Sequence, residues 1–134
     1  MTLRRMLDTN IVSGLIKGHP DISRRIIAAP ISSLCISAIT LGELRFGLAK
    51  RPKAQRLRAA IEEFLMRVEV LPWDDFAAGR YGALRAEMEG AGKSLAALDM
   101  LIAAHALATG AILVTNDGAF RQVAGLNVED WTTA

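Results

Sequence analysis

Four acidic residues are the groups in this sequence best suited to do chemistry: Asp8, Glu43, Asp99 and Asp117. Asp8 and Asp117 each follow directly on a short apolar run, and Asp99 interrupts a long apolar segment. A carboxylate in apolar surroundings is normally paired, protonated or bound to a cation, because leaving it unpaired there is very unfavourable. Convergent acids with no matching basic residues beside them suggest a hard divalent metal.

Three of these acids also have purely structural interpretations. Asp8 is well placed to cap a helix that follows it. Thr40 and Glu43 have the spacing of a capping box, although Ser37 competes with Thr40 for the cap position. Asp117 stands in a sequence that is typical of a turn. Taken one at a time, these three acids therefore leave both interpretations open.

Asp99 is the hardest to explain structurally. We expect it in the middle of an apolar helix, where no backbone amide is free and where its neighbours three and four positions away are Leu95, Ala96, Ile102 and Ala103. Acids that converge on one place would repel each other unless a cation lay between them. The four residues together therefore predict a metal site.

The elements that must position these acids alternate between strand and helix. Strands are expected at residues 3–7, 34–36, 70–71, 111–115 and 127–129. Helices are expected at residues 11–17, 21–28, 38–48, 57–68, 74–89 and 95–109, with Ser37 and Ser94 as caps and Gly110 as a terminator. This order predicts a layered α/β domain with a mostly parallel sheet flanked by helices. Ligands of such sheets bind beyond the carboxyl ends of the strands, where two of the acids are expected.

The composition is that of one folded domain. The chain has 134 residues, of which 51% are hydrophobic and 22% charged, so it can bury a core. Cys35, the single cysteine, lies in an apolar segment and is expected to be a buried structural thiol. No segment approaches the roughly 18 apolar residues that span a bilayer, and no signal sequence is evident. We therefore expect a cytoplasmic protein that does not bind membranes.

Basic residues are concentrated in one part of the chain. The net charge is only +2, but residues 44–61 contain no acid and hold Arg45, Lys50, Arg51, Lys53, Arg56 and Arg58. Such a block can attract a polyanion, or it can be an ordinary solvated loop and helix face. Both interpretations remain open for these residues alone.

Several stretches of the chain resemble one known family. The matching segments are Met6–Asn10, Ile36–Gly47, Leu98–Ala106, Leu113–Asp117 with Phe120, and Gly125–Trp131. In these segments the chain resembles the PIN-domain ribonucleases and, within them, the VapC toxins of bacterial toxin-antitoxin pairs. The resemblance covers nearly the whole chain and implies a single PIN domain over residues 1–134, with three layers around a central sheet.

The resemblance also implies roles for individual residues. Asp8, Glu43, Asp99 and Asp117 would be the catalytic carboxylates that bind Mg²⁺, for which Mn²⁺ can substitute. The residues that orient them would be Thr9, Asn10, Thr115 and Asn116. The chain departs from many relatives in the short loop before Phe120, where Asp117 is the only acid. For the basic rim that holds the RNA backbone, the candidates are Arg45, Lys50, Arg51 and Arg85.

The implied function is metal-dependent endonucleolytic hydrolysis of RNA phosphodiester bonds, which leaves a 5′ phosphate and a 3′ hydroxyl. The protein would be a toxin held inactive by a small cognate antitoxin. It would form a homodimer, or a hetero-oligomer with that antitoxin. The antitoxin would lie across an apolar groove lined by the first helices and the helix at residues 57–68.

Two other functions are alternatives to this one. Phosphatases of the haloacid dehalogenase type need a second Asp two residues after the first, and here Asn10 stands at that position. A catalytically weak, PIN-like RNA-binding or scaffold protein is the remaining alternative.

His105 is expected to be a core residue because it lies on a different helical face from Asp99. Trp73 and Trp131 are expected to cover the core.

Overall fold

The fold is a five-stranded parallel sheet between two layers of helices. The computed structural model describes residues 3–133. The strands, in the sheet order β3-β2-β1-β4-β5, are β3 Glu69–Leu71, β2 Leu34–Ser37, β1 Arg5–Leu7, β4 Ile112–Val114 and β5 Val128–Glu129. All four pairings between neighbouring strands are parallel. The predicted α/β class is therefore confirmed, and the strand at residues 127–129 lies at an edge of the sheet, as expected.

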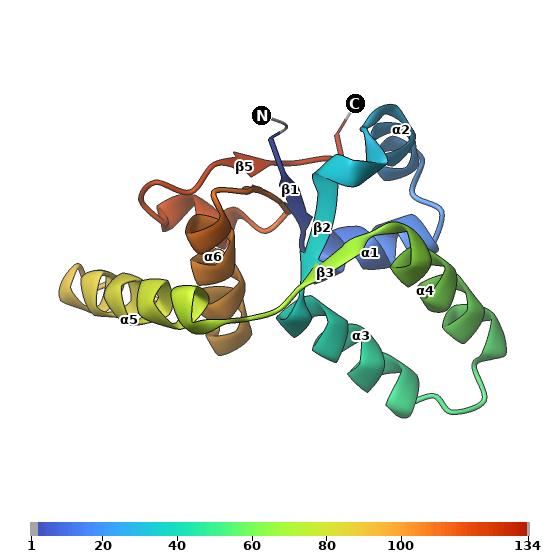
Figure 1. Ribbon diagram of the computed structural model, residues 1–134, viewed down its shortest axis with the longest axis horizontal. Coiled ribbons are helices and arrows are strands. Elements are labelled where there is room, and N and C mark those ends of the chain that lie inside the picture. Colours follow the sequence, from blue (N-terminus) through green and yellow to red (C-terminus); the bar gives the residue numbers. More distant parts are fainter. Residues whose placement is uncertain (1–2, 134) are drawn as a thin grey trace.

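Helices cover both faces of the sheet (Figure 1). Their bounds are α1 Thr9–Ile16, α2 Pro20–Ala28, α3 Ala38–Ala49, α4 Gln55–Arg67, α5 Asp75–Gly90 and α6 Ala97–Thr109, with short 3-10 turns at Ile31–Ser33 (η1) and Gly118–Gln122 (η2). Successive side chains of a strand point to opposite faces. Met6 and Leu113 accordingly enter the core with α5 and α6, whereas Leu7 and Val114 enter the core with α1, α2 and α4. The expected three layers are confirmed.

The sequence predicted a residue for the start of α3 and for both ends of α6, and two of these three predictions are correct. Ser37 caps α3, because its hydroxyl oxygen accepts a hydrogen bond from the backbone N–H of Ile39 at 3.1 Å. Ser94 does not cap α6, which begins at Ala97 after a cap position without a side-chain hydrogen bond. Gly110 ends α6 as predicted, with φ of 70° in the left-handed region that glycine adopts without strain.

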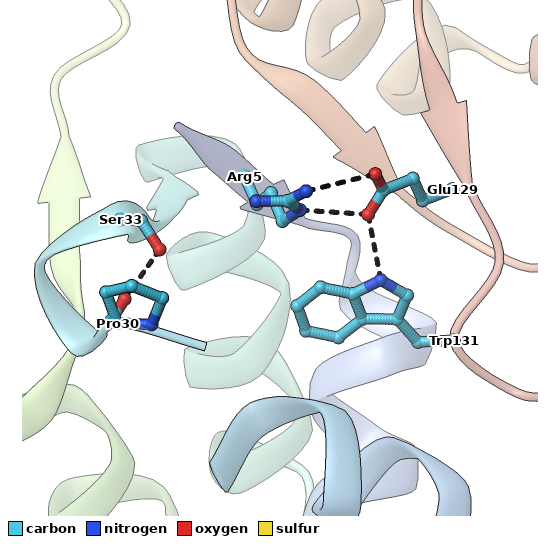
Figure 2. A network of polar contacts seen from close by, with 5 residues as sticks. All are labelled: Arg5, Pro30, Ser33, Glu129 and Trp131. Atoms are coloured by element: carbon cyan, nitrogen blue, oxygen red, sulfur yellow. Dashed lines mark hydrogen bonds and ion pairs between the residues drawn. The ribbon is translucent and has the colours of Figure 1, made fainter. Parts of the chain in front are cut away.

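A polar network ties the carboxyl-terminal segment to the first strand (Figure 2). Arg5 on β1 donates two hydrogen bonds, of 2.9 and 3.2 Å, to Glu129 on β5, so the pair reaches across β4. The indole N–H of Trp131 donates to the same carboxylate at 3.0 Å. The guanidinium of Arg5 holds the pKa of Glu129 below its ordinary value. Trp131 is buried, which confirms its expected place in the core.

Two reactive residue types are structural in this fold. His105 is buried and its Nδ1 lies 2.7 Å from the hydroxyl of Ser37, while burial lowers the pKa of its imidazole. Cys35 is also buried, and burial raises the pKa of its thiol to about 11. Both expectations are confirmed. Within residues 3–133, no helix is both long and apolar enough to cross a membrane.

Candidate active site

The carboxyl edge of the sheet gathers the four acids. Asp8 directly follows β1 and caps α1, and Asp117 follows β4 and caps the turn η2. Glu43 lies on α3, the helix that leaves β2, and Asp99 lies in the first turn of α6. Because β2, β1 and β4 are parallel neighbours, the elements that leave them start at one edge of the sheet.

Asp8 is the most buried of the four acids, with 3% of its surface exposed. One carboxylate oxygen accepts the backbone N–H of Thr9 and the other accepts the hydroxyl of Thr115, each at 2.8 Å. Burial raises the pKa of Asp8, the two hydrogen bonds oppose that rise, and the charges of Glu43 and Asp117 add to it. Asp8 therefore caps α1, as one interpretation expected, and it lies close enough to Glu43 and Asp117 for their charges to raise its pKa.

Thr9 links the first helix to the third. Its hydroxyl donates to Glu43 Oε1 at 2.7 Å, and the hydroxyl of Thr40 lies 3.4 Å from it. The carboxylate of Glu43 is therefore turned toward α1. The capping-box interpretation of Thr40 and Glu43 is wrong, because the hydroxyl of Ser37 already caps the helix.

Thr115 connects the acids at the ends of β1 and β4. Its hydroxyl donates to Asp8 and accepts the backbone N–H of Asp117 at 3.1 Å. One oxygen of Asp117 accepts the N–H of Ala119 at 2.9 Å, which is the turn role that the sequence suggested. The other carboxylate oxygen of Asp117 has no hydrogen-bond partner among residues 3–133. A single buried hydroxyl thus joins the carboxylate of Asp8 to the backbone of Asp117.

Asp99 has a different environment from the one expected. It lies in the first turn of α6 and not in the middle of a helix, because α6 starts two residues later than predicted. Across residues 3–133 its carboxylate has no hydrogen bond and no ion pair. Desolvation, and then the charges of Asp8, Asp117 and Glu43, raise its pKa to about 6. Its proximity to all three carboxylates places Asp99 in the same cluster.

The cluster carries negative charge that no basic side chain offsets. In the described part of the chain, each of the ion pairs joins other residues, and none includes one of the four acids. Among residues 3–133, no group of three or more acidic, histidine or cysteine side chains is arranged so that it could hold a metal ion without other ligands. Mg²⁺ needs no such cage, because it binds through one or two carboxylates and keeps several waters. The residues present therefore fit Mg²⁺ or Mn²⁺ better than structural zinc.

The residues expected to orient the acids divide into two pairs. Thr9 and Thr115 hold carboxylates by direct hydrogen bonds. Asn10 and Asn116 are exposed, and neither side chain has a hydrogen bond to the four acids among residues 3–133. The structure therefore brings only the two threonines into contact with the acids.

The residues expected to bind RNA also differ among themselves. Arg45 forms an ion pair with Glu62. Arg85 pairs with Glu89 at 3.1 Å and donates to the hydroxyl of Tyr81 at 2.9 Å. Lys50 and Arg51, in contrast, line a cleft of about 220 Å³ that also includes Glu43, the only one of the four acids among its lining residues. The same cleft is lined by two residues that the sequence analysis missed, Ser13 and Lys17. Their spacing from Thr9, four and eight positions later in α1 and its C-cap, was the available signal.

Comparison with known proteins identifies the family. A family model described as a PIN domain matches residues 5–126. The chain belongs to the PIN-domain family. This membership and the predicted fold are therefore confirmed, and the sheet edge that carries the acids lies within the matched region.

PIN-domain relatives of the VapC type match nearly the full chain. The tRNA(fMet)-specific endonuclease VapC of Shigella flexneri is 40% identical over 131 residues, which are 97% of this chain and 99% of the relative. Ribonuclease VapC2 of Rickettsia felis is 36% identical over 129 residues, 94% of this chain and 96% of the relative. The resemblance to VapC ribonucleases is confirmed.

Two solved VapBC structures contain chains that are similar to this one. The DNA-bound VapBC of Salmonella typhimurium has a chain with a TM-score of 0.90 and 40% identity, covering 96% of this chain and 98% of that one. VapBC2 of Rickettsia felis, bound to a promoter DNA fragment, gives a TM-score of 0.89 at 35% identity, with coverage of 96% and 99%. The fold described above is therefore that of the VapC ribonucleases.

Proposed function

We propose that the protein is a Mg²⁺-dependent endoribonuclease, with Mn²⁺ able to substitute, that serves as the toxin of a toxin-antitoxin pair. One observation carries this proposal: four carboxylates without basic partners meet at the carboxyl edge of the sheet in a chain that matches VapC ribonucleases along nearly its full length. The uncompensated negative charge favours the binding of a cation, and the VapC relatives indicate that the reaction is RNA cleavage.

Asp8 and Asp99 are the main ligands in this proposal. When bound, the cation would lower the pKa of a water for in-line attack and neutralise charge on the phosphate. Thr115 holds one oxygen of Asp8 in place, so this carboxylate is oriented before the cation arrives. The backbone N–H of Asp117 bonds the same threonine, and the carboxylate oxygen of Asp117 that Ala119 leaves free would be a further ligand.

Glu43 positions the attacking water. The hydroxyl of Thr9 occupies Glu43 Oε1, which leaves Oε2 to accept a hydrogen bond from water. A carboxylate that is already held by one donor presents its free oxygen in a fixed direction. Hydrolysis by water needs no side-chain nucleophile, which agrees with the buried, structural positions of Cys35 and His105.

Initiator tRNA is the first substrate to examine. The Shigella relative is named as specific for tRNA(fMet), and it is 40% identical to this chain. Cleavage of this tRNA by the purified protein should require Mg²⁺ or Mn²⁺, stop with EDTA, and disappear in Asp99→Asn. A folded, Mg²⁺-loaded protein that cuts neither this tRNA nor total cellular RNA would instead favour the RNA-binding or scaffold alternative.

An antitoxin would occupy a separate apolar groove. This groove of about 540 Å³ lies between α1, α2 and α4, whose apolar faces were expected to line it. Ile27 and Ile31 lie at its edge with 84% and 55% of their surfaces exposed. Isolated apolar side chains at that exposure are usual, but two beside a groove mark a docking surface. The solved relatives named VapBC support an antitoxin as its occupant.

A homodimer remains part of the proposal. Phe46 on α3 and Phe76 on α5 expose 62% and 75% of their surfaces and lie outside the apolar groove. Burial of such aromatic side chains against a second copy would stabilise association. Sedimentation of the purified protein should give twice the monomer mass, and Phe46→Glu should shift it to the monomer.

A further inference from the structure

The cleft next to the acids has two chemically different ends. Its inner end is formed by Thr9 and Glu43, which belong to the candidate active site. Its outer end is formed by Lys17, Lys50 and Arg51, and apolar side chains of α3 and α4 make the floor between them. A ligand that fills this cleft would therefore contact Glu43 at one end and basic side chains at the other.

The basic residues at the outer end are free to meet an anion. Lys17 and Arg51 form no ion pair within the part of the chain that the structure describes, unlike Arg45 and Arg85. The ammonium of Lys50 lies 4.6 Å from the centroid of the Phe46 ring, which holds it beside an aromatic face without neutralising it. Unpaired cations at the mouth of a cleft attract the phosphates of a nucleic acid.

Gly47 of α3 is one of the residues that line the cleft. It lies inside α3, where a glycine is less favourable than an alanine by roughly 1 kcal/mol. A Cβ at this position would meet no atom within 4 Å, so no contact within the chain requires a glycine here. Because Gly47 lines the cleft, a side chain at this position would enter it. Packing within the chain therefore does not explain the glycine at position 47, whereas the need for open space in the cleft does.

We propose that this cleft is a nucleotide subsite, which binds one unpaired base of the RNA adjacent to the phosphodiester that is cut. The proposal rests on the proposed ribonuclease function. In it, Lys17 and Arg51 contact the neighbouring backbone phosphate, and the hydroxyl of Ser13 faces the base. The apolar floor covers a face of the base, and a volume of about 220 Å³ admits a single base. Ser13 and Gly47 are thus the residues that would determine specificity, and Lys17 and Arg51 would position the RNA backbone.

RNA fits this cleft better than a protein segment does. The apolar groove is the surface suited to a protein partner, and the cleft shares only Ile16 with it. A polyanion matches the three cations at the outer end, and an RNA backbone bound there can extend toward Glu43 at the inner end. Antitoxin binding in the cleft is therefore an outcome that the experiment must be able to detect.

Filling the cleft tests the steric part of the proposal. The protein is made as Asp99→Asn so that RNA is bound but not cut, and the probe is fluorescently labelled initiator tRNA followed by anisotropy. Gly47→Leu should weaken binding at least tenfold. Gly82→Leu is the matched control, since Gly82 is an exposed helical glycine on α5 whose added Cβ would also meet nothing within 4 Å. Both changes should raise the melting temperature, because each removes a helical glycine.

Removing charge tests the electrostatic part. Lys17→Gln with Arg51→Gln should weaken tRNA binding and reduce the slope of log Kd against log salt by about 1.4, since each phosphate contact to a single strand contributes roughly 0.7. Arg67→Gln is the control, because Arg67 forms an exposed pair with Glu63 and lines the other groove. An unchanged slope in the double variant would show that these two side chains do not contact phosphate.

The subsite proposal is overturned if Gly47→Leu binds tRNA as tightly as Gly82→Leu, or if the Asp99→Asn protein binds no RNA at all. It is also overturned if Gly47→Leu leaves RNA binding unchanged and abolishes antitoxin binding. These results are distinguishable from failure of the ribonuclease proposal, which is decided separately by Mg²⁺-dependent cleavage with Asp99 intact.

Discussion

Replacing Asp99 by Asn should stabilise the cation-free protein while it removes activity. The pKa of Asp99 is raised from 3.8 to about 6, first by desolvation and then by three neighbouring carboxylates. The folded protein therefore holds this proton more tightly than the unfolded chain does. The contribution of Asp99 to stability is therefore greatest below pH 4, falls as the pH rises through 6, and stays low above it.

The magnitude follows from the size of the shift. The difference between about 6 and 3.8 is roughly two pKa units, and each unit corresponds to about 1.36 kcal/mol. Since Asp99 is partly exposed and solvent screens its charge, we expect a net penalty of about 1–2 kcal/mol at neutral pH. Asparagine has nearly the same shape and no charge, so Asp99→Asn should recover most of that amount.

Urea unfolding in EDTA measures the effect. At pH 7.5 the unfolding free energy of Asp99→Asn should exceed that of the wild type by about 1–2 kcal/mol, and the difference should vanish near pH 4. Added Mg²⁺ should stabilise the wild type and leave Asp99→Asn unchanged, because only the former binds the ion.

Asp8→Asn is the matched control and should behave differently. Both oxygens of Asp8 accept hydrogen bonds, so an amide NH₂ in place of one oxygen would face a donor. We expect this variant to gain little stability or to lose some. The reasoning is refuted if Asp99→Asn is less stable than the wild type at pH 7.5, or if its advantage persists unchanged at pH 4.

Three further predictions concern other parts of the molecule. Thr115→Val should lower Mn²⁺ affinity in calorimetry about 10–100-fold, because Asp8 loses the donor that orients it; affinity equal to the wild type would contradict this. Glu129→Ala should lower the unfolding free energy by about 1–2 kcal/mol at pH 7 by leaving its donors unpaired. The loss should shrink as the pH falls below the lowered pKa of Glu129, and a loss independent of pH in denaturant titrations would refute that cause. Ile27→Asp should abolish copurification of the antitoxin with RNA cleavage intact, whereas Met66→Asp, equally exposed on α4 but outside the groove, should not.

Local signals predicted most of the fold. Apolar runs marked β1 and β4, the position of Ser37 marked the start of α3, and Gly110 marked the end of α6. The alternation of strands and helices then placed the residues after β1 and β4 at the same edge of the sheet. Asp8 and Asp117 were therefore expected to lie near each other before any contact was known.

Tertiary contacts decided what the sequence alone left open. The start of α6 was misplaced because the apolar residues from 95 onward continue the helical pattern beyond the helix itself. Arg45 on α3 and Lys17 at the end of α1 are both basic, yet Arg45 pairs with Glu62 whereas Lys17 lines the cleft that includes Glu43. Only the packing of α1 and α4 against α3 separates these two cases.

The most direct test of the shared cation site is a crystal of the protein soaked in Mn²⁺ and measured at the manganese absorption edge. We predict an anomalous peak in contact with the carboxylates of Asp8 and Asp99, and no such peak in crystals of Asp99→Asn. A wild-type crystal with no peak at these carboxylates, or a peak that persists in Asp99→Asn, would contradict the assignment of the four acids to one metal site.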